Sequence, residues 1–257
     1  MAVVTVDVTG PVASITLHNP AKLNAMSRVM WQELMLAFAS IKETPGLRCV
    51  VVAGQGSHFS AGGDISEYPA FRFNETSLRE FHEVQVWGAL QAMLDCSLPI
   101  VASIEGNCIG AGLEIASCCD VRVATTCARF GAPIARLGFP MAPREAALVM
   151  GAVGELCARE MLLTARLLDA PTMAQRGFLN QVCSGDDLPA VVQSYVTGIC
   201  QLSPATAALN KHTFRALAQI KYAQAATELI ANAYHYADSA EHREGVMAFI
   251  DKRPPNF

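Results

Sequence analysis

The chain has 257 residues, of which 52 % are apolar and only 16 % are charged. Globular proteins average about 25 % charged residues, so we expect an oligomer to bury part of the surface. The formal net charge is −4 and no run of Lys or Arg occurs, which argues against a nucleic-acid partner.

No secretory signal or membrane span is predicted. The first residues lack a basic and an apolar region, and the longest uncharged run, 188–210, contains prolines and a glycine. The nine cysteines form no zinc-binding pattern, so we expect reduced, mostly buried thiols in a cytoplasmic protein.

The first third is predicted to run strand, strand, helix, strand. Alternating apolar residues over 4–8 and 13–18, separated by a Gly-Pro turn, predict an antiparallel hairpin. Ser27 is a suitable helix N-cap, because apolar residues follow it at helical spacing as far as Ile41. The apolar run 49–53 predicts a buried strand.

The middle third repeats this order around two turns of small residues. The first turn, 60–64, follows the strand 49–53, and a polar stretch at 72–77, expected to be mobile, precedes a helix that ends at Leu94. A strand at 100–102 then leads to the second turn, 110–112, a helix at 113–118 and a strand at 121–124.

The last part is predicted to be mainly helical. After a proline-containing loop at 130–143, the only strand expected is 181–183, and alanine-rich sequence beyond 204 predicts three helices. We place a boundary between a core, 1–202, and a helical C-terminal region, 203–257.

The second turn has the form of an anion site. A strand that enters a glycine-rich turn and a helix leaves free backbone N–H groups at the positive end of the helix dipole. Glu114 lies on the first helical turn and could act there as an acid or base. Taken alone, the Gly-Ala-Gly sequence is better explained as a plain strand-to-helix connection with a solvated glutamate.

Five segments in order resemble the enoyl-CoA hydratase/isomerase (crotonase) superfamily. They are HNPAKLNAMS (18–27), FSAGGDISE (59–67), PIVASIEGNCIGAGLEIASCCDVRVA (99–124), RFGAPIARLGFP (129–140) and EHREGVMAFIDKRPPNF (241–257). The resemblance implies an α/β fold, a spiral of repeated ββα units, with a helical C-terminal trimerisation region. It also implies a homotrimer or dimer of trimers.

The same resemblance implies an acyl-CoA substrate, with CoA as part of the substrate and no separate cofactor or metal. The oxyanion hole maps to the N–H groups of Gly63 and Ala111, and a catalytic carboxylate maps to Glu114. Alanine replaces the family's glycine at position 111, but the backbone donor remains. Positions that map to CoA contacts are Lys22, Leu23, Ala61, Asp64, Ile65, Phe249 and Lys252. The last two would reach in from the tail of the same or a neighbouring subunit.

The sequence departs from the family pattern at one position that bears on the reaction. Family hydratases usually have a second glutamate, and that position is Ile134 here, which we expect to line the pocket. Enoyl-CoA hydration remains the leading expectation. The alternatives are isomerisation, decarboxylation or thioester hydrolysis with one carboxylate, or acyl-CoA binding without catalysis. Whether Arg144 or Glu145 points into the pocket stays open.

Other polar residues have plainer interpretations. Tyr68 is expected in the acyl site or, equally, in the core. His82 and Glu83 are expected on an exposed helix face, and His58 in a solvated loop. The remaining histidines of the tail are expected at the surface or an interface: His212, His235 and His242.

Overall fold

The computed structural model describes residues 2–257, except for the side chains of residues 218–228. Its larger sheet has the strand order β1-β2-β3-β4-β6-β9. Only the β1–β2 pair is antiparallel, as the predicted hairpin requires, and the other four pairs are parallel. The strands are β1 (Val3–Thr9), β2 (Val12–His18), β3 (Cys49–Gly54), β4 (Ile100–Ile104), β6 (Val121–Thr125) and β9 (Gln181–Cys183).

A smaller sheet, absent from the predictions, has the order β5-β7-β8. Its strands are only two or three residues long: β5 (Asn107–Ile109), β7 (Arg129–Gly131) and β8 (Leu168–Asp169). Strands this short contain too few residues to show an alternating pattern. The predicted loop at 130–143 therefore contains part of a strand, and also a 3₁₀ turn, η4 (Ile134–Leu137).

Helices pack on both faces of the larger sheet. Those of the first two thirds are η1 (Pro20–Lys22), α1 (Arg28–Glu43), η2 (Ile65–Ala70), α2 (Glu75–Glu80), the π-helical turn η3 (Phe81–Val86), α3 (Trp87–Asp95) and α4 (Ala111–Cys118). Those of the last third are α5 (Pro143–Val153), α6 (Glu155–Thr164), α7 (Ala170–Gln175), α8 (Leu188–Gln201), α9 (Pro204–Ile230) and α10 (Ala240–Ile250). Ser27 caps α1 as predicted, since its side chain accepts from the Met30 N–H.

Alternate side chains of the parallel strands divide the core into two layers. On one face Cys49, Val101 and Val123 pack with α8 through residues such as Val192. On the other face the strand residues join a larger cluster with α1, α3 and α4. The parallel strands are apolar on both sides because both sides are covered.

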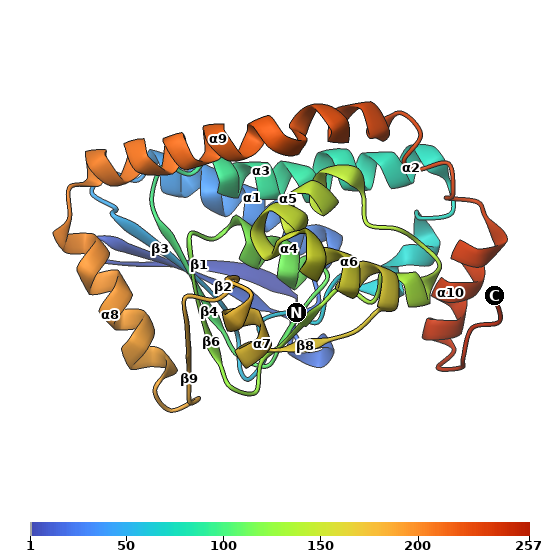
Figure 1. Cartoon of the computed structure of the whole chain (residues 1–257), viewed down its shortest axis with the longest axis horizontal. Coiled ribbons are helices and arrows are strands. Elements are labelled where there is room, and N and C mark those ends of the chain that lie inside the picture. Colours follow the sequence, from blue (N-terminus) through green and yellow to red (C-terminus); the bar gives the residue numbers. More distant parts are fainter. Residues whose placement is uncertain (1) are drawn as a thin grey trace.

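The C-terminal region contains two helices in the described structure, and the prediction of three was wrong. Residues 204–230 contain no internal glycine or proline after the first position, so nothing interrupts α9, and residues 231–238 form turns. Figure 1 shows α9 running along one side of the molecule, from α8 to the end that holds α10. Within the described residues, no helix is long and apolar enough to cross a membrane.

Helix α10 folds back on its own chain, where it packs against η2 and η4. The approach is close: a Cβ added to Gly245 would lie 2.7 Å from the Gly138 backbone nitrogen. The C-terminal residues thus reach η2, which directly follows the first small-residue turn, and η4, which begins at Ile134. The boundary at 202/203 stays a prediction, although α8 and α9 meet there.

Candidate active site

The two small-residue turns lie against each other. The loop after β3 runs parallel to β5, because the Ser60 N–H donates to the Asn107 carbonyl at 2.8 Å and the Ser60 carbonyl accepts from the Ile109 N–H at 3.0 Å. Gly62 has a φ of +114° and packs beside Gly110, where an added Cβ would lie 3.6 Å from the Gly62 Cα. Glycine at both positions lets the backbones approach closely.

This contact places the backbones of Gly63 and Ala111 at one cavity of about 60 Å³. Ala111 is the first residue of α4, so its N–H has no partner within the helix. Neither N–H donates a hydrogen bond to any residue in the described part of the chain. The structure therefore brings the two predicted oxyanion donors together at a helix N-terminus.

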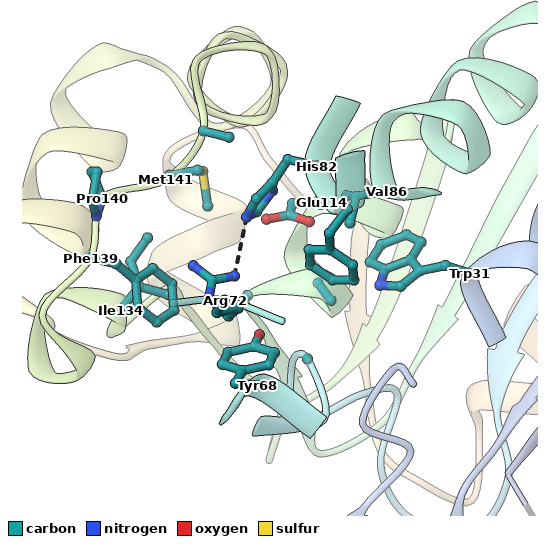
Figure 2. Close-up of a pocket in the computed structure, with 15 residues that line it drawn as sticks. Trp31, Tyr68, Arg72, His82, Val86, Glu114, Ile134, Phe139, Pro140 and Met141 are labelled. Carbon is teal, nitrogen blue, oxygen red and sulfur yellow. Dashed lines mark hydrogen bonds between the residues drawn. The ribbon is translucent and has the colours of Figure 1, made fainter. Parts of the chain in front are cut away.

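The cavity is lined mainly by apolar side chains, with four polar ones among them (Figure 2). Ile134 is in the lining, as predicted, and Tyr68 is too. The lining residues are Trp31, Gly63, Tyr68, Arg72, Phe81, His82, Val86, Gly110, Ala111, Glu114, Ile134, Phe139, Pro140, Met141 and Ala142.

Glu114 is the carboxylate that lines the cavity, on the first turn of α4. Its pKa is raised from 4.5 to about 8, mainly by burial and also by the charge of Glu145, while Arg72 acts in the opposite direction. A carboxyl in such a site favours its protonated form at neutral pH. Glu114 is thus poised to donate a proton as well as to accept one.

Arg72 was expected in a mobile polar stretch, and that expectation is wrong. Its side chain is buried, with 1 % relative exposure. The guanidinium lies over the rings of Tyr68 and Phe139, at 4.5 and 4.0 Å from their centroids. It donates to Tyr236 and His242, which are more than 160 residues away in the sequence, so local sequence gave no signal for its burial.

His82 was expected on an exposed helix face with Glu83, and this expectation is also wrong. Their side chains are 12 % and 17 % exposed. The π-helical turn η3 places His82 at the cavity, and π turns often occur at functional sites. Glu83 is not part of the cavity lining; it binds Arg144 at 3.0 Å and accepts from the Tyr234 hydroxyl at 2.5 Å.

Neither Arg144 nor Glu145 lines the cavity, which answers the question of whether one of them points into the pocket. Glu145 is nevertheless close to it, because its Oε1 lies 2.9 Å from His82 Nδ1. His82 Nε2 lies 3.1 Å from Arg72 Nη1. Since arginine only donates, Nε2 accepts and Nδ1–H donates to Glu145. Burial and Arg72 hold the pKa of His82 well below 6.5, which keeps the ring neutral.

Two other histidines differ from their predicted surroundings. His242 is fully buried, and both ring nitrogens have partners: Nδ1–H donates to the Ala237 carbonyl and Nε2 accepts from Arg72. His58 is half-buried and accepts from the Asn107 N–H at 3.1 Å. His212 and His235 are exposed, as predicted.

The residues predicted to contact CoA lie outside the cavity lining. Lys22 Nζ pairs with the Asp64 carboxylate at 2.6 Å, and Asp64 also caps η2, which begins at Ile65. The Ala61 N–H donates to the Leu23 carbonyl at 3.0 Å, which joins the two loops. The side chains of Phe249 and Lys252, at the end of α10 and just beyond it, are exposed. Their roles toward CoA stay predictions.

A buried carboxyl beside two unpartnered backbone N–H groups is an arrangement typical of enzymes that stabilise an oxyanion. The family model Enoyl-CoA hydratase/isomerase matches residues 7–257, and the chain belongs to this family of enzymes, the crotonase superfamily. Its fold is the α/β crotonase fold, with two sheets and C-terminal helices.

Relatives cover nearly the whole chain. A probable enoyl-CoA hydratase of Mycobacterium tuberculosis is 29 % identical over 96 % of this chain and 94 % of its own. The crystal structure of an enoyl-CoA hydratase/carnithine racemase from Magnetospirillum magneticum is 31 % identical, covers 100 % of this chain and 96 % of its own, and has a TM-score of 0.83. A methylmalonyl-CoA decarboxylase in complex with 2-nitronate-propionyl-CoA is 25 % identical, covers 99 % and 97 %, and has a TM-score of 0.88.

Proposed function

We propose that this acyl-CoA enzyme is an enoyl-CoA hydratase in which the N–H groups of Gly63 and Ala111 hold the thioester oxygen and Glu114 is the acid/base. The observation that carries the proposal is the placement of two unpartnered N–H groups and one buried carboxyl around one cavity. Lys22, Leu23, Ala61, Asp64, Ile65, Phe249 and Lys252 are proposed to contact the CoA moiety.

Addition of water to the β-carbon moves the double-bond electrons toward the thioester carbonyl, whose oxygen becomes an enolate oxygen. The two backbone donors and the positive end of α4 stabilise that charge without moving. Removing one such donor in comparable sites costs about 2.7–4 kcal/mol of barrier. Ala111 retains its backbone N–H, so the alanine at this position does not remove the proposed donor.

A single protonated carboxyl can serve both sides of the addition. Its hydroxyl gives a proton to the α-carbon while its other oxygen takes a proton from the attacking water, so Glu114 ends neutral again. The raised pKa of Glu114 supports this role, because the protonated form is the starting form. The aliphatic Ile134 in the cavity lining leaves Glu114 without the usual second carboxyl beside it.

The same observation favours a second candidate, decarboxylation of a carboxylated acyl-CoA. Loss of CO₂ also produces a thioester enolate, needs no water, and leaves only one proton to deliver to the α-carbon. Glu114 and the two N–H groups would suffice. The methylmalonyl-CoA decarboxylase among the similar structures gives this reaction a precedent on a related chain.

The test is a comparison of crotonyl-CoA hydration and methylmalonyl-CoA decarboxylation by the native enzyme and by Glu114→Gln. Hydration that falls at least about a hundredfold in the variant supports the proposal, since general acid–base help is worth about 10²–10⁴. Turnover of methylmalonyl-CoA alone would favour decarboxylation. Binding of both esters with turnover of neither would indicate a non-catalytic acyl-CoA binder.

A further inference from the structure

Arg72 provides a buried cation in the cavity lining, packed against two aromatic rings. Figure 2 shows its guanidinium between the Tyr68 and Phe139 rings, with its tip directed toward His82. Burying a charge among aromatic and aliphatic groups is costly unless an opposite charge or a full set of hydrogen bonds compensates it. The hydrogen-bond partners of Arg72 therefore show whether its charge is compensated within the protein or is available to a ligand.

The described partners of Arg72 are three groups without formal charge. Nε donates to His242 Nε2 at 3.4 Å, Nη1 to His82 Nε2 at 3.1 Å, and Nη2 to the Tyr236 hydroxyl at 3.2 Å. Both histidines are held neutral by burial and by Arg72 itself. An arginine has five N–H donors, so two of them have no acceptor among the described residues.

No carboxylate of the described residues lies within ion-pair distance of Arg72. Glu114 lines the same cavity, but burial favours its protonated form. Glu145 hydrogen-bonds His82, which lies between it and Arg72, and Glu83 is already paired with Arg144. The positive charge at Arg72 is thus available to a ligand.

We propose that the substrate's acyl group ends in a carboxylate, and that Arg72 binds this carboxylate while Gly63 and Ala111 hold the thioester oxygen. The proposal rests on the function proposed above, because it assumes that the cavity receives the acyl part of a CoA thioester. Arginine suits this task, since its planar donors match the two oxygens of a carboxylate.

Cavity size limits the acyl group to a short chain. A single water needs roughly 10–15 Å³ of such volume, so a cavity of about 60 Å³ holds only a few non-hydrogen atoms. An ion pair with Arg72 also stabilises a carboxylate against leaving as neutral CO₂. The inferred substrate class is therefore a short dicarboxylic mono-CoA thioester whose distal carboxylate is retained.

The test is calorimetric binding of matched CoA esters to the full-length protein. Succinyl-CoA is compared with 4-methylpentanoyl-CoA, and malonyl-CoA with 3-methylbutanoyl-CoA, because in each pair an isopropyl group replaces the carboxylate. The native protein is expected to prefer the carboxylated ester in at least one pair by about tenfold or more, the size of a charge-assisted hydrogen bond.

Variants show whether Arg72 causes the preference. Arg72→Gln is expected to abolish it, and Arg72→Lys to retain part of it. The control is Arg79→Gln, which removes a positive charge from α2 outside the cavity lining and should leave the preference unchanged. If Arg72→Gln does not fold, the test rests on the ratio of the two esters' affinities in the native protein and in Arg72→Lys, where the preference should be reduced.

The possible failures are distinguishable. Equal or tighter binding of the uncharged esters, or an unchanged ratio in a folded Arg72→Gln variant, would overturn the carboxylate proposal and leave Arg72 as a structural link to α10. Failure to bind CoA or any of these esters would instead contradict the proposed function, and the carboxylate proposal with it.

Discussion

Glu114 and Glu145 show how burial sets the chemistry of a residue. The pKa of each is raised from 4.5 to about 8, with burial as the largest cause. The folded protein then holds these protons more tightly than the unfolded chain does. Their contribution to stability is full below pH 4.5 and is lost as the pH rises toward 8.

The pH dependence of activity follows from the same shift. If protonated Glu114 starts the reaction, kcat/KM should be level near neutrality and fall once the pH exceeds about 8. A rate profile on crotonyl-CoA between pH 6 and 10, with stability checked at each pH, measures this fall. A profile that rises through this range would mean that the ionised form of Glu114 is the active one.

Glu145→Gln separates the charge of Glu145 from its hydrogen bond. The amide oxygen of glutamine can still accept from His82 Nδ1–H, but the negative charge that raises the Glu114 pKa is gone. The alkaline fall in kcat/KM should therefore move to lower pH. Glu83→Gln is the control for a nearby carboxylate outside the cavity lining, and an equal movement in that variant would show that Glu145 has no special coupling to Glu114.

At the scale of elements, the predictions were correct for helices and strands whose apolar pattern is complete within one continuous stretch of sequence. The hairpin, α1 with its Ser27 cap, and the strands at 49–53 and 121–124 have apolar patterns long enough to identify them. The resemblance assigned Gly63 and Ala111 to one site, and the structure brings both to one cavity. The three short strands of the second sheet are specified by pairing with distant segments, so they were missed.

The polar side of the cavity was not predictable in this way. Arg72 is buried only because Tyr236 and His242 return from the C-terminal region, and His82 faces inward because of the π-helical turn η3. Glu145 lies beside His82 through the packing of α5, a relation that no sequence spacing shows. Arg72, His82 and Glu145 therefore could not be assigned to the site from sequence, because contacts between distant segments or a local π-helical turn set their positions.

The docking of α10 gives a prediction at this scale. Gly245 packs on the backbone of η4, where an added Cβ would lie 2.5 Å from the Leu137 carbonyl oxygen. Gly245→Ala should destabilise the protein by about 1–3 kcal/mol. It should also weaken the hydrogen bond between Arg72 and His242, because His242 lies on the same helix. Gly198→Ala in α8 is the matched control: its Cβ meets open space, so it should stabilise by about 0.5–1 kcal/mol. Denaturant unfolding measures both, and equal effects would contradict this packing.

The whole molecule carries apolar side chains on its outer helices. Leu209, Phe214 and Leu217 of α9 are 64–69 % exposed, and Leu156 and Leu163 of α6 are more than 70 % exposed. Scattered apolar residues are ordinary on a surface, but several on neighbouring turns of one helix favour an interface. This pattern agrees with the low charged fraction and with the resemblance, which places subunit contacts in the C-terminal region.

We therefore predict a trimer or a dimer of trimers assembled partly through α9. Light scattering coupled to size exclusion should give a mass of three or six copies of the 27.5 kDa chain. A double substitution, Phe214→Glu with Leu217→Glu, should shift the mass toward the monomer, because charges buried in an interface without partners are costly. Val8→Glu, at an exposed position on β1, is the control and should leave the mass unchanged. A native monomer, or a double variant that keeps the native mass, would show that the exposed face of α9 is not the interface.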